Sequence, residues 1–553
     1  MTPYRVNDDL IRRAVAAYEA RTWPEAESAC AEILAENPDQ TDALQILGNI
    51  RARSGDTRAA EPLFERARAA APDNIFILNS LGGIYAANGK PELARAALEA
   101  ALRIDSRFPW ALHNLGSLML ELGERRVARR CFERALESNP VHVDAIAALA
   151  DVAEQDQQPD EARALANRAR KVAPDHVTAR LVLARLELRV GSHATAEHQL
   201  RALLELPGVR PANQASARAL LGKSLEGLGR YDEAYREYTR ANDIERELHA
   251  PRYAVADAVS SPATIARLTG FMQDTDPANW TRPAPDDLSS PVFLVGFPRS
   301  GTTLLEQLLA AHPGIIALEE QENFADAVGP LLLAPGSPER WDKLAQSELA
   351  DLRRAYWKRV DAALGTRLDG RTFIDKLPLN LALLPLIHLL FPDAKIILAL
   401  RDPRDVILSC LRNRFAMNTA MFQFLSPETA TGYYDAVMSL ADLARAKLPM
   451  AVHEVRYEDV VNDLRGTAQK LVAFLGLPWN DSVLNHVETA RRRNLRTPSR
   501  SQVVRPIYRT SLAQWRNFEP QLTPVLPRLE RWVRRFDYWG SILSSSSNPE
   551  RSE

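Results

Sequence analysis

The sequence predicts a chain of two structural parts, an all-α superhelix of helix-pair repeats followed by an α/β domain with a mainly parallel sheet. Two observations lead to this fold class. In the first half, a pattern of small and apolar residues returns every 34 residues, as in Gly48, Gly82 and Gly116. From Pro291 onward, short apolar runs typical of β-strands alternate with segments of helical periodicity. At 553 residues the chain is also too long for one ordinary hydrophobic core.

The repeats are explained by pairs of antiparallel helices that stack on one another. Small residues let the two helices approach closely, and one pair cannot bury its apolar face alone. The recurring positions are the leucine-glycine pairs Leu47-Gly48, Leu81-Gly82, Leu115-Gly116 and Leu221-Gly222, and the alanines Ala60, Ala94, Ala128, Ala162, Ala196 and Ala234. This pattern resembles the tetratricopeptide repeat family, with about seven repeats over about residues 7–246.

The resemblance implies a superhelix whose concave face binds peptide segments. We therefore expect the repeat domain, residues 1–246, to bind an acceptor protein or another protein partner. A spacer or a dimerisation surface is the alternative, which keeps a homodimer open. Residues 247–289 break the period and are rich in Pro, Asp and Ser at their ends, so they are expected to be a connector. The polar tail 543–553 is expected to be disordered.

The composition argues against several other classes of protein. A net charge of −2 gives no general attraction to nucleic acid or to anionic membranes. The cysteines Cys30, Cys131 and Cys410 lie too far apart in sequence for a recognisable zinc or disulfide pattern. Charged residues and prolines interrupt the most apolar stretch, residues 377–400, so it is interpreted as buried helix and strand and not as a membrane span. With no signal peptide apparent, we expect a cytoplasmic protein.

The stretch FLVGFPRSGTT, residues 293–303, indicates a strand, a glycine-rich loop and a helix start. Backbone N–H groups at such a helix start surround an anion, and the helix dipole strengthens the binding. A nucleoside-triphosphate loop would continue with lysine, but Thr302 stands there and Arg299 lies inside the loop. The loop therefore favours a phosphate that is met by arginine and hydroxyl groups without a metal. A plain glycine-rich turn is the alternative.

A second motif, ALRDPRDVILS, makes the phosphate interpretation more specific. It predicts a strand that ends at Leu400, then Arg401, then a helix that begins at Pro403 and carries Ser409. An arginine and a hydroxyl in this arrangement can bind a second phosphate.

Together, PRSGTT and the Arg401–Ser409 pair resemble the sulfotransferase superfamily, over about residues 290–540. That resemblance implies 3′-phosphoadenosine 5′-phosphosulfate as the sulfuryl donor and co-substrate. It also implies that Arg401 and Ser409 hold the 3′-phosphate, and that the loop holds the 5′-phosphosulfate through Arg299, Ser300, Gly301, Thr302 and Thr303.

Within the superfamily, the stretches AAHPGIIALEEQENF, DKLPLN and VRYEDVV resemble the tyrosylprotein sulfotransferases. On this resemblance Glu320 is the catalytic base, with Glu319 as its competitor. Lys376 meets the sulfuryl oxygens, Tyr457 contacts adenine and Ser499 lies near the transferring group. We expect a sulfotransferase domain at residues 290–542 that needs no metal. Without an apparent membrane anchor, and with its repeats, the chain looks more like the repeat-containing sulfotransferases of bacteria.

Alternatives remain for both the acceptor and the reaction. A protein tyrosine is favoured because repeats bind peptides, and a carbohydrate or small-molecule hydroxyl is the alternative. A P-loop kinase or NTPase is disfavoured because the Gly-Lys-Thr sequence and a strand-end aspartate for Mg²⁺ are missing. A nucleotide-binding scaffold without catalysis is disfavoured by the combination of a candidate base, Glu320, with the cations Lys376 and Arg299.

Overall fold

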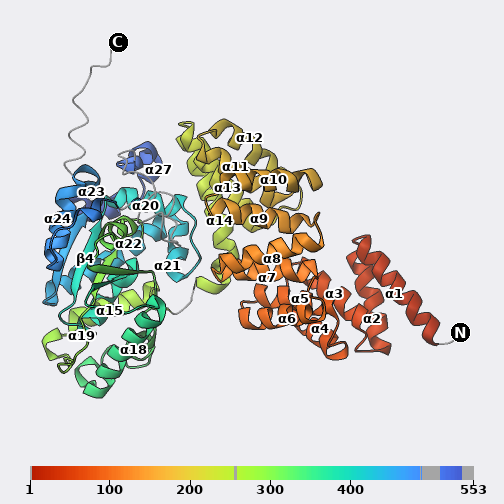
Figure 1. Cartoon of the computed structure of the whole chain (residues 1–553), viewed down its shortest axis with the longest axis horizontal. Helices are drawn as coiled ribbons and strands as arrows, with labels where there is room; N and C mark the ends of the chain where they lie inside the picture. The colour runs from red at the N-terminus through yellow and green to blue at the C-terminus, as the bar shows by residue number, and fades with distance from the viewer. Residues whose placement is uncertain (1–2, 255–257, 486, 488–510, 539–553) are drawn as a thin grey trace, which may run out of the picture. The chain divides into compact units, whose positions relative to one another are not determined.

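The computed structural model describes residues 3–254, 258–485, 487 and 511–538 of the chain (Figure 1). Its contacts divide the chain into two compact units, Met1–Gly208 and Val209–Glu553. The first unit is helical, and the second contains a parallel sheet with helices on both faces. The predicted fold class, a tetratricopeptide-type helical array followed by an α/β domain, is confirmed.

The first unit consists of antiparallel helix pairs. At the predicted glycines, the two helices of a pair approach so closely that a side chain would not fit. A Cβ atom on Gly82 would lie 2.4 Å from Cγ of Leu98 in the paired helix, and one on Gly116 would lie 2.6 Å from the Phe132 ring. The helices are α1 (Pro3–Glu19), α2 (Trp23–Glu36), α3 (Thr41–Arg53), α4 (Thr57–Ala70), α5 (Ile75–Ala87), α6 (Pro91–Ile104), α7 (Pro109–Glu121), α8 (Arg125–Ser138), α9 (Val143–Gln155), α10 (Pro159–Val172), α11 (Val177–Arg189) and α12 (His193–Leu204).

Two turns of the array lack the glycine that the others carry, and both keep its backbone conformation. Gly55 and Gly89 have φ angles of 88° and 71°, in the left-handed region that glycine adopts without strain. Arg21 and Gln157 stand at the same turn with φ angles of 60° and 64°. The stacking of the helices therefore imposes this conformation even on residues that do not favour it.

The second unit begins with a helix pair of the same kind, α13 (Pro211–Gly227) and α14 (Tyr231–Tyr253). A Cβ atom on Gly222 of α13 would lie 2.6 Å from the Tyr238 ring of α14. The amide Nδ2 of Asn242 in α14 donates to the Leu411 carbonyl in the α/β domain at 2.9 Å. By its packing, this last pair is part of the same compact unit as the sheet. The repeat boundary at residue 246 remains a prediction about sequence pattern.

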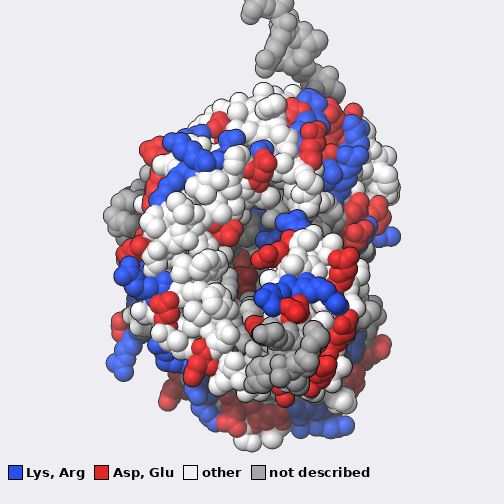
Figure 2. All heavy atoms as spheres, turned by 90° about the vertical axis from the view of Figure 1, so that its right-hand side faces the viewer, with Lys and Arg blue, Asp and Glu red and all other residues white. Residues whose placement is uncertain are grey.

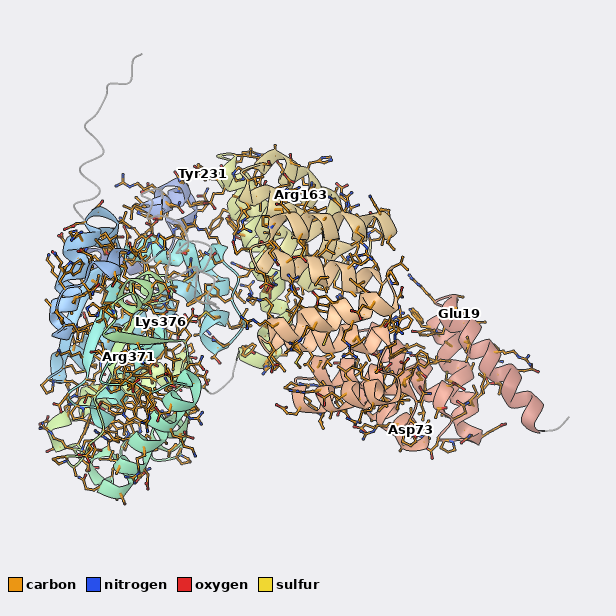
Figure 3. All side chains as sticks on the ribbon, viewed as in Figure 1. Glu19, Asp73, Arg163, Tyr231, Arg371 and Lys376 are labelled. Atoms are coloured by element: carbon orange, nitrogen blue, oxygen red, sulfur yellow. The ribbon has the colours of Figure 1, made fainter. Side chains whose placement is uncertain are left out.

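The sheet of the second unit is parallel throughout, in the order β2-β3-β1-β4-β5. The strands are β1 (Val292–Gly296), β2 (Ile315–Glu319), β3 (Thr372–Lys376), β4 (Lys395–Leu400) and β5 (Ala451–Arg456). In Figure 3, Lys376 marks the carboxyl end of β3, and Arg371 is the residue just before its first residue. Residues 377–400 form a 3₁₀ turn, a short buried helix and β4, which confirms the interpretation of this apolar stretch as core.

Helices cover both faces of the sheet. On one face, Leu294 and Ile397 share a hydrophobic core with Leu305 of α16 and Leu471 of α24. On the other face, Phe293 packs against the rings of Phe324 and Tyr356. The helical segments are α15 (Pro262–Asp274), η1 (Pro277–Asn279), α16 (Thr302–Ala310), α17 (Ala325–Val328), η2 (Gly329–Leu333), η3 (Trp341–Lys343), α18 (Gln346–Leu364), η4 (Pro378–Leu383), α19 (Leu384–Leu390), α20 (Pro403–Arg412), α21 (Thr419–Phe422), η5 (Gln423–Leu425), α22 (Pro427–Lys447), α23 (Tyr457–Asn462), α24 (Leu464–Leu475), η6 (Asp481–Asn485), η8 (Gln514–Phe518), α27 (Glu519–Leu522) and α28 (Leu526–Arg535).

Two further observations concern nucleic acid and membranes, the partners that the composition argued against. On the face in Figure 2, the basic and acidic side chains of the described residues are interspersed. Among the helices that the structure describes, none has the length and apolar character needed to cross a bilayer.

The packing of Gly82 leads to a stability prediction with an adjacent control in the same helix. We expect Gly82→Ala to lower the free energy of unfolding by about 1–3 kcal/mol, because its Cβ would overlap the fully buried Leu98. Gly83→Ala meets no atom within 4 Å and should instead stabilise by about 0.5–1 kcal/mol through helix propensity. Denaturant unfolding of the full chain checks both. Shifts of the same sign in the two variants would contradict the packing argument.

Candidate active site at the carboxyl edge of the sheet

All five strands bring a predicted site residue to the same edge of the sheet. Parallel strands end on one side, so the segments that follow them meet there, as in ligand sites of open α/β sheets. The segments are the loop after β1, Glu320 after β2, Lys376 at the end of β3, Arg401 after β4 and Tyr457 after β5. The sequence motifs, which lie far apart along the chain, are therefore parts of one edge.

The loop after β1 is tightly constrained at both of its glycines. A Cβ on Gly296 would lie 2.6 Å from the Ala399 carbonyl oxygen of β4, so β1 and β4 approach closely at this point. Gly301 has a φ of 95°, and a Cβ there would lie 2.7 Å from the Tyr457 ring. Arg299 also adopts a positive φ, of 75°. These turns lead the chain directly into α16 at Thr302.

The end of this loop has the properties of an anion site. Ser300, Thr302 and Thr303 are buried, yet within the described part of the chain their hydroxyls make no hydrogen bond. The N–H groups in the first turn of α16 have no intrahelical partner, as at any helix start. Hydroxyl and N–H donors around a helix N-terminus bind phosphate-like groups. The predicted loop residues are therefore gathered, and their donors are available.

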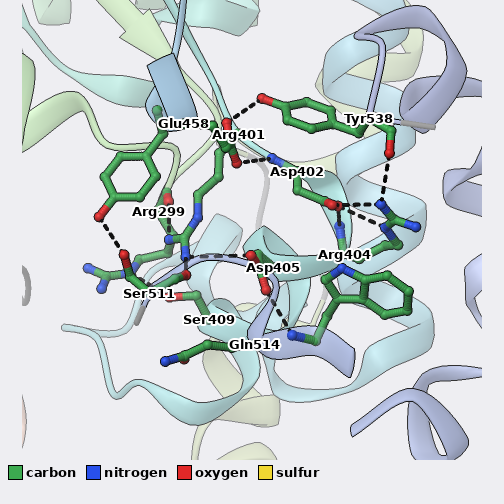
Figure 4. Close-up of polar contacts among 12 residues, drawn as sticks. Arg299, Arg401, Asp402, Arg404, Asp405, Ser409, Glu458, Ser511, Gln514 and Tyr538 are labelled. Atoms are coloured by element: carbon green, nitrogen blue, oxygen red, sulfur yellow. Dashed lines mark hydrogen bonds and ion pairs between the residues drawn. The ribbon is translucent and has the colours of Figure 1, made fainter. Parts of the chain in front are cut away.

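Arg299, Arg401 and Ser409 form one contact cluster (Figure 4). Nε of Arg299 donates to Oγ of Ser409 at 3.0 Å, and Nη1 of Arg401 donates to the Arg299 carbonyl oxygen at 3.3 Å. Nε of Arg401 is buried and has no hydrogen-bond partner among the residues that the structure describes. Nη2 of the same guanidinium lies 3.9 Å from Oδ2 of Asp405. The strand-end arginine and the helix serine thus lie beside the loop, as the sequence motifs predicted.

Tyr457 lies between the loop and Arg401. The Arg401 guanidinium stacks over the Tyr457 ring at 4.8 Å, and the Tyr457 hydroxyl lies 2.9 Å from Oγ of Ser511. Nη2 of Arg401 donates to the Ser511 carbonyl at 2.7 Å. Ser511 was missed by the sequence reasoning, although it lies in the C-terminal segment from which Ser499 was chosen. Ser499 itself lies outside the described residues.

A buried polar network holds the two helix starts that flank this cluster. The Arg404 guanidinium pairs with Asp402 at 2.7 Å, and the Asp402 N–H donates to Glu458 at 3.2 Å. Glu458 in turn accepts from the Tyr538 hydroxyl at 2.7 Å. Burial raises the pKa of Glu458, and the Tyr538 hydrogen bond opposes that rise. Arg404 is therefore a structural arginine, whereas Arg401 in the same motif lies beside the anion loop.

Lys376 is fully buried among three carboxylates. Its Nζ lies 2.8 Å from Glu320, 3.3 Å from Glu306 and 3.8 Å from Glu319. Burial by itself lowers the pKa of Lys376, but the three carboxylates outweigh it and leave the pKa raised. The lysine therefore stays charged and holds the three carboxylates together at this part of the sheet edge.

The two candidate bases differ in geometry. Glu319 ends β2 and its side chain is 14% exposed, whereas Glu320 is 38% exposed and lies nearer to Lys376. Glu320 has a positive φ of 44°, and its N–H donates to the Lys376 carbonyl at 2.8 Å. This backbone bond turns the side chain of Glu320 out of the strand register, so an incoming substrate can reach it more readily than Glu319.

Two buried carboxylates in this region were missed by the sequence reasoning. Glu306 of α16 has no exposed surface and contacts Lys376. An acidic residue inside the apolar run LLEQLL was the available signal. Asp375 points to the other face of β3, where Asn323 and Tyr356 donate to its Oδ2 at 2.9 and 2.8 Å. Burial raises the pKa of Asp375 from 3.8 to about 6, although these two hydrogen bonds and Lys376 lower it.

The fold and the edge define an α/β domain whose first loop has the properties of an anion site, and comparison with known proteins gives the family of this domain. Residues 291–481 match the model of the sulfotransferase family. Residues 46–107, 113–177, 147–206 and 181–243 match the tetratricopeptide repeat model. The C-terminal half therefore contains a sulfotransferase-family domain, and the N-terminal half contains tetratricopeptide repeats, as the sequence motifs predicted.

Several relatives cover parts of the chain. An uncharacterized protein of Aquifex aeolicus is 28% identical over 351 residues, which is 61% of this chain and 44% of that protein. Protein-tyrosine sulfotransferase A of Caenorhabditis elegans is 25% identical over 50% of this chain and 74% of its own length. Protein-tyrosine sulfotransferase 1 of Homo sapiens is 29% identical over 40% of this chain and 62% of its own length. This chain thus spans less than half of the first of these relatives.

Among solved structures, a tetratricopeptide repeat protein from Parabacteroides merdae is 20% identical and covers 43% of this chain and 93% of its own, with a TM-score of 0.36.

The raised pKa of Asp375 leads to a prediction about pH. The folded protein holds the Asp375 proton up to about pH 6, whereas the unfolded chain loses it near pH 3.8. Wild-type stability should therefore fall, relative to Asp375→Asn, as pH rises through this window. The difference in the free energy of unfolding between wild type and Asp375→Asn should change by up to about 3 kcal/mol across this window. Unfolding of both proteins at about pH 4.5 and pH 7.5 measures it. The exposed Asp361→Asn serves as the matched control, and a difference that is independent of pH would contradict the assignment.

Proposed function

We propose that the C-terminal domain transfers the sulfuryl group of 3′-phosphoadenosine 5′-phosphosulfate to the hydroxyl of a protein tyrosine. The observation that carries this proposal is the contact of Arg299 with both Ser409 and Arg401 beside a loop whose buried hydroxyls are available. Two separate sets of phosphate-binding groups suit a donor with phosphates at both its 3′ and 5′ positions. The sulfotransferase-family match supports the same reaction class.

On the donor side, we assign the 5′-phosphosulfate to Arg299, Ser300, Gly301, Thr302 and Thr303. The helix start and the hydroxyls supply donors there without a metal. We assign the 3′-phosphate to Arg401 and Ser409, because the buried, unpartnered Nε of Arg401 gains a hydrogen bond to an anion. Tyr457, which closes the loop at Gly301, is assigned to the adenine side.

On the acceptor side, Glu320 is the proposed general base. The acceptor oxygen forms a bond to sulfur as the bond from sulfur to the 5′-phosphate oxygen breaks, and the acceptor proton passes to Glu320. Protonation removes the negative charge that pairs with Lys376. With this one of its three carboxylate partners neutralised, Lys376 is less fully compensated and can donate to the sulfuryl oxygens, which it stabilises together with Arg299. Ser499 is assigned to the same region on the resemblance alone.

The names of two relatives and the repeats support tyrosine as the acceptor. The relatives from Caenorhabditis elegans and Homo sapiens are protein-tyrosine sulfotransferases. Repeats of this kind form extended binding surfaces, which suits a protein acceptor better than a small molecule.

The donor assignment is tested first by ligand binding. We expect adenosine 3′,5′-bisphosphate to bind in the absence of magnesium, and ADP to bind at least tenfold more weakly because it lacks the 3′-phosphate. Arg401→Ala should weaken the bisphosphate by roughly 10- to 100-fold, since a charge-assisted hydrogen bond contributes about 1.5–3 kcal/mol. Isothermal titration calorimetry measures these affinities. Exposed Arg354→Ala on α18 is the control and should bind like wild type. If ADP binds as tightly as adenosine 3′,5′-bisphosphate, or if binding requires magnesium, the donor assignment is wrong.

The base assignment is tested by activity on a tyrosine-containing peptide with radiolabelled donor. Glu320→Gln should lower kcat by about 10²–10⁴, because a general base is lost, while bisphosphate affinity stays near that of wild type. Glu319→Gln should cost much less, and the exposed Glu322→Gln should leave the rate unchanged. If Glu319→Gln instead abolishes turnover and Glu320→Gln does not, the base is Glu319.

A further inference from the structure

Lys223 is a cation of the repeat-type helix α13 that no described residue neutralises directly. The described part of the chain gives it no hydrogen bond and no ion pair. Glu226 stands three residues further along the same helix, so the two side chains share a face of α13. Both oxygens of Glu226 are already engaged, Oε1 with Arg412 and Oε2 with the Tyr238 hydroxyl, each at 2.7 Å. The carboxylate therefore offers Lys223 little compensation.

A short series of contacts leads from this face of α13 to the anion loop. Glu226 pairs with Arg412, the last residue of α20. Ser409 lies three residues before Arg412 on α20 and accepts from Arg299 of the loop at 3.0 Å. All of these residues belong to one compact unit, Val209–Glu553. The face that carries Lys223 is therefore connected to the Ser409 side of the candidate site.

The electrostatic environment of Lys223 agrees with this position. Burial and the nearby guanidinium groups of Arg412 and Arg299 lower its pKa, and Glu226 only partly opposes them. By its accessible surface, Lys223 is nevertheless an exposed residue of α13. A group that is desolvated by its surroundings and still reachable by solvent is expected to line a recess. A cation in such a recess gains more from an incoming anion than a cation on an open surface does.

We propose that Lys223 binds the 3′-phosphate of the donor together with Arg401 and Ser409, so that the last repeat-type helix pair is part of the donor site. This inference rests on the proposed function. The 3′-phosphate is favoured over the acceptor because the contacts run through Ser409 and Arg412. The acidic group around Lys376 contains no member of this series. The repeat-type pair α13 and α14 thus contributes directly to donor binding.

The test compares two ligands that differ only in the 3′-phosphate. Wild type, Lys223→Ala and Lys223→Arg are titrated calorimetrically with adenosine 3′,5′-bisphosphate and with adenosine 5′-monophosphate. We expect Lys223→Ala to weaken the bisphosphate by about tenfold and the monophosphate hardly at all. Lys223→Arg should retain most of the affinity. Lys171→Ala, an exposed lysine of helix α10, is the matched control and should leave both affinities unchanged.

Each outcome has a distinct meaning. Equal losses for both ligands, or no loss for either, would overturn the role of Lys223 while leaving the donor assignment intact. A raised KM for the peptide acceptor with unchanged bisphosphate affinity would overturn it too, and would move Lys223 to the acceptor side. If wild type binds neither ligand, the proposed function fails and the inference fails with it. Thermal unfolding of Lys223→Ala checks that a lost affinity does not reflect a lost fold.

Discussion

The close parallel pairing of β1 with β4 is the constraint on which the candidate site depends. Gly296 pairs with Ala399 at the end of the register, and the backbone of β4 leaves no room for a side chain on Gly296. This pairing sets the loop after β1 beside the residue after β4. Arg299 can then contact both Arg401 and Ser409, although more than one hundred residues separate the two arginines in the chain. Any residue larger than glycine at position 296 would force β1 and β4 apart. The loop after β1 and the segment that begins with Arg401 both start at this point.

The edge of the sheet is divided into a basic side and an acidic side. The basic side contains Arg299, Arg401 and Ser409, with Arg412 and Lys223 behind them. The acidic side is organised around the single buried cation Lys376. Buried charges are costly unless they are paired. Each side of the edge therefore contains both positively and negatively charged side chains, but in unequal numbers. The excess of positive charge on one side suits an anionic donor, and the excess of carboxylates on the other suits removal of a proton.

The last repeat-type helix pair belongs to the same compact unit as the α/β domain. The last helix pair, α13 and α14, keeps the glycine-to-aromatic contact of the repeats at Gly222 and Tyr238. The same pair packs against α20 and the segment that follows it, through Glu226, Asn242 and Glu245. Its outer charges therefore serve as interface residues for the α/β domain. Within the second unit, this repeat-type helix pair is therefore held to α20, the helix that carries Ser409.

Local chemistry is what the sequence by itself determined. The repeat period, the strand–loop–helix motif, the strand-end arginine and the order of helices and strands all follow from residues that are near one another in the chain. Glycine, proline and apolar periodicity act over a few residues, so they can be recognised without a structure. These signals were sufficient to predict the fold class and to select the candidate site residues. Those residues are Arg299, Arg401, Ser409, Tyr457, Lys376 and Glu320.

Tertiary structure alone decided which charged groups meet. The apolar neighbours of Glu306 indicate a buried position, but only the packing of α16 on the sheet brings its carboxylate to Lys376. Ser511 contacts Arg401 and Tyr457 from a distant C-terminal segment, and Asp375 is buried by residues from two other elements. The position of Lys223 depends on how α13 packs against α20. Burial and pairing of charge are set by long-range contacts, and the energy of a charge depends on those contacts far more than on its neighbours in sequence.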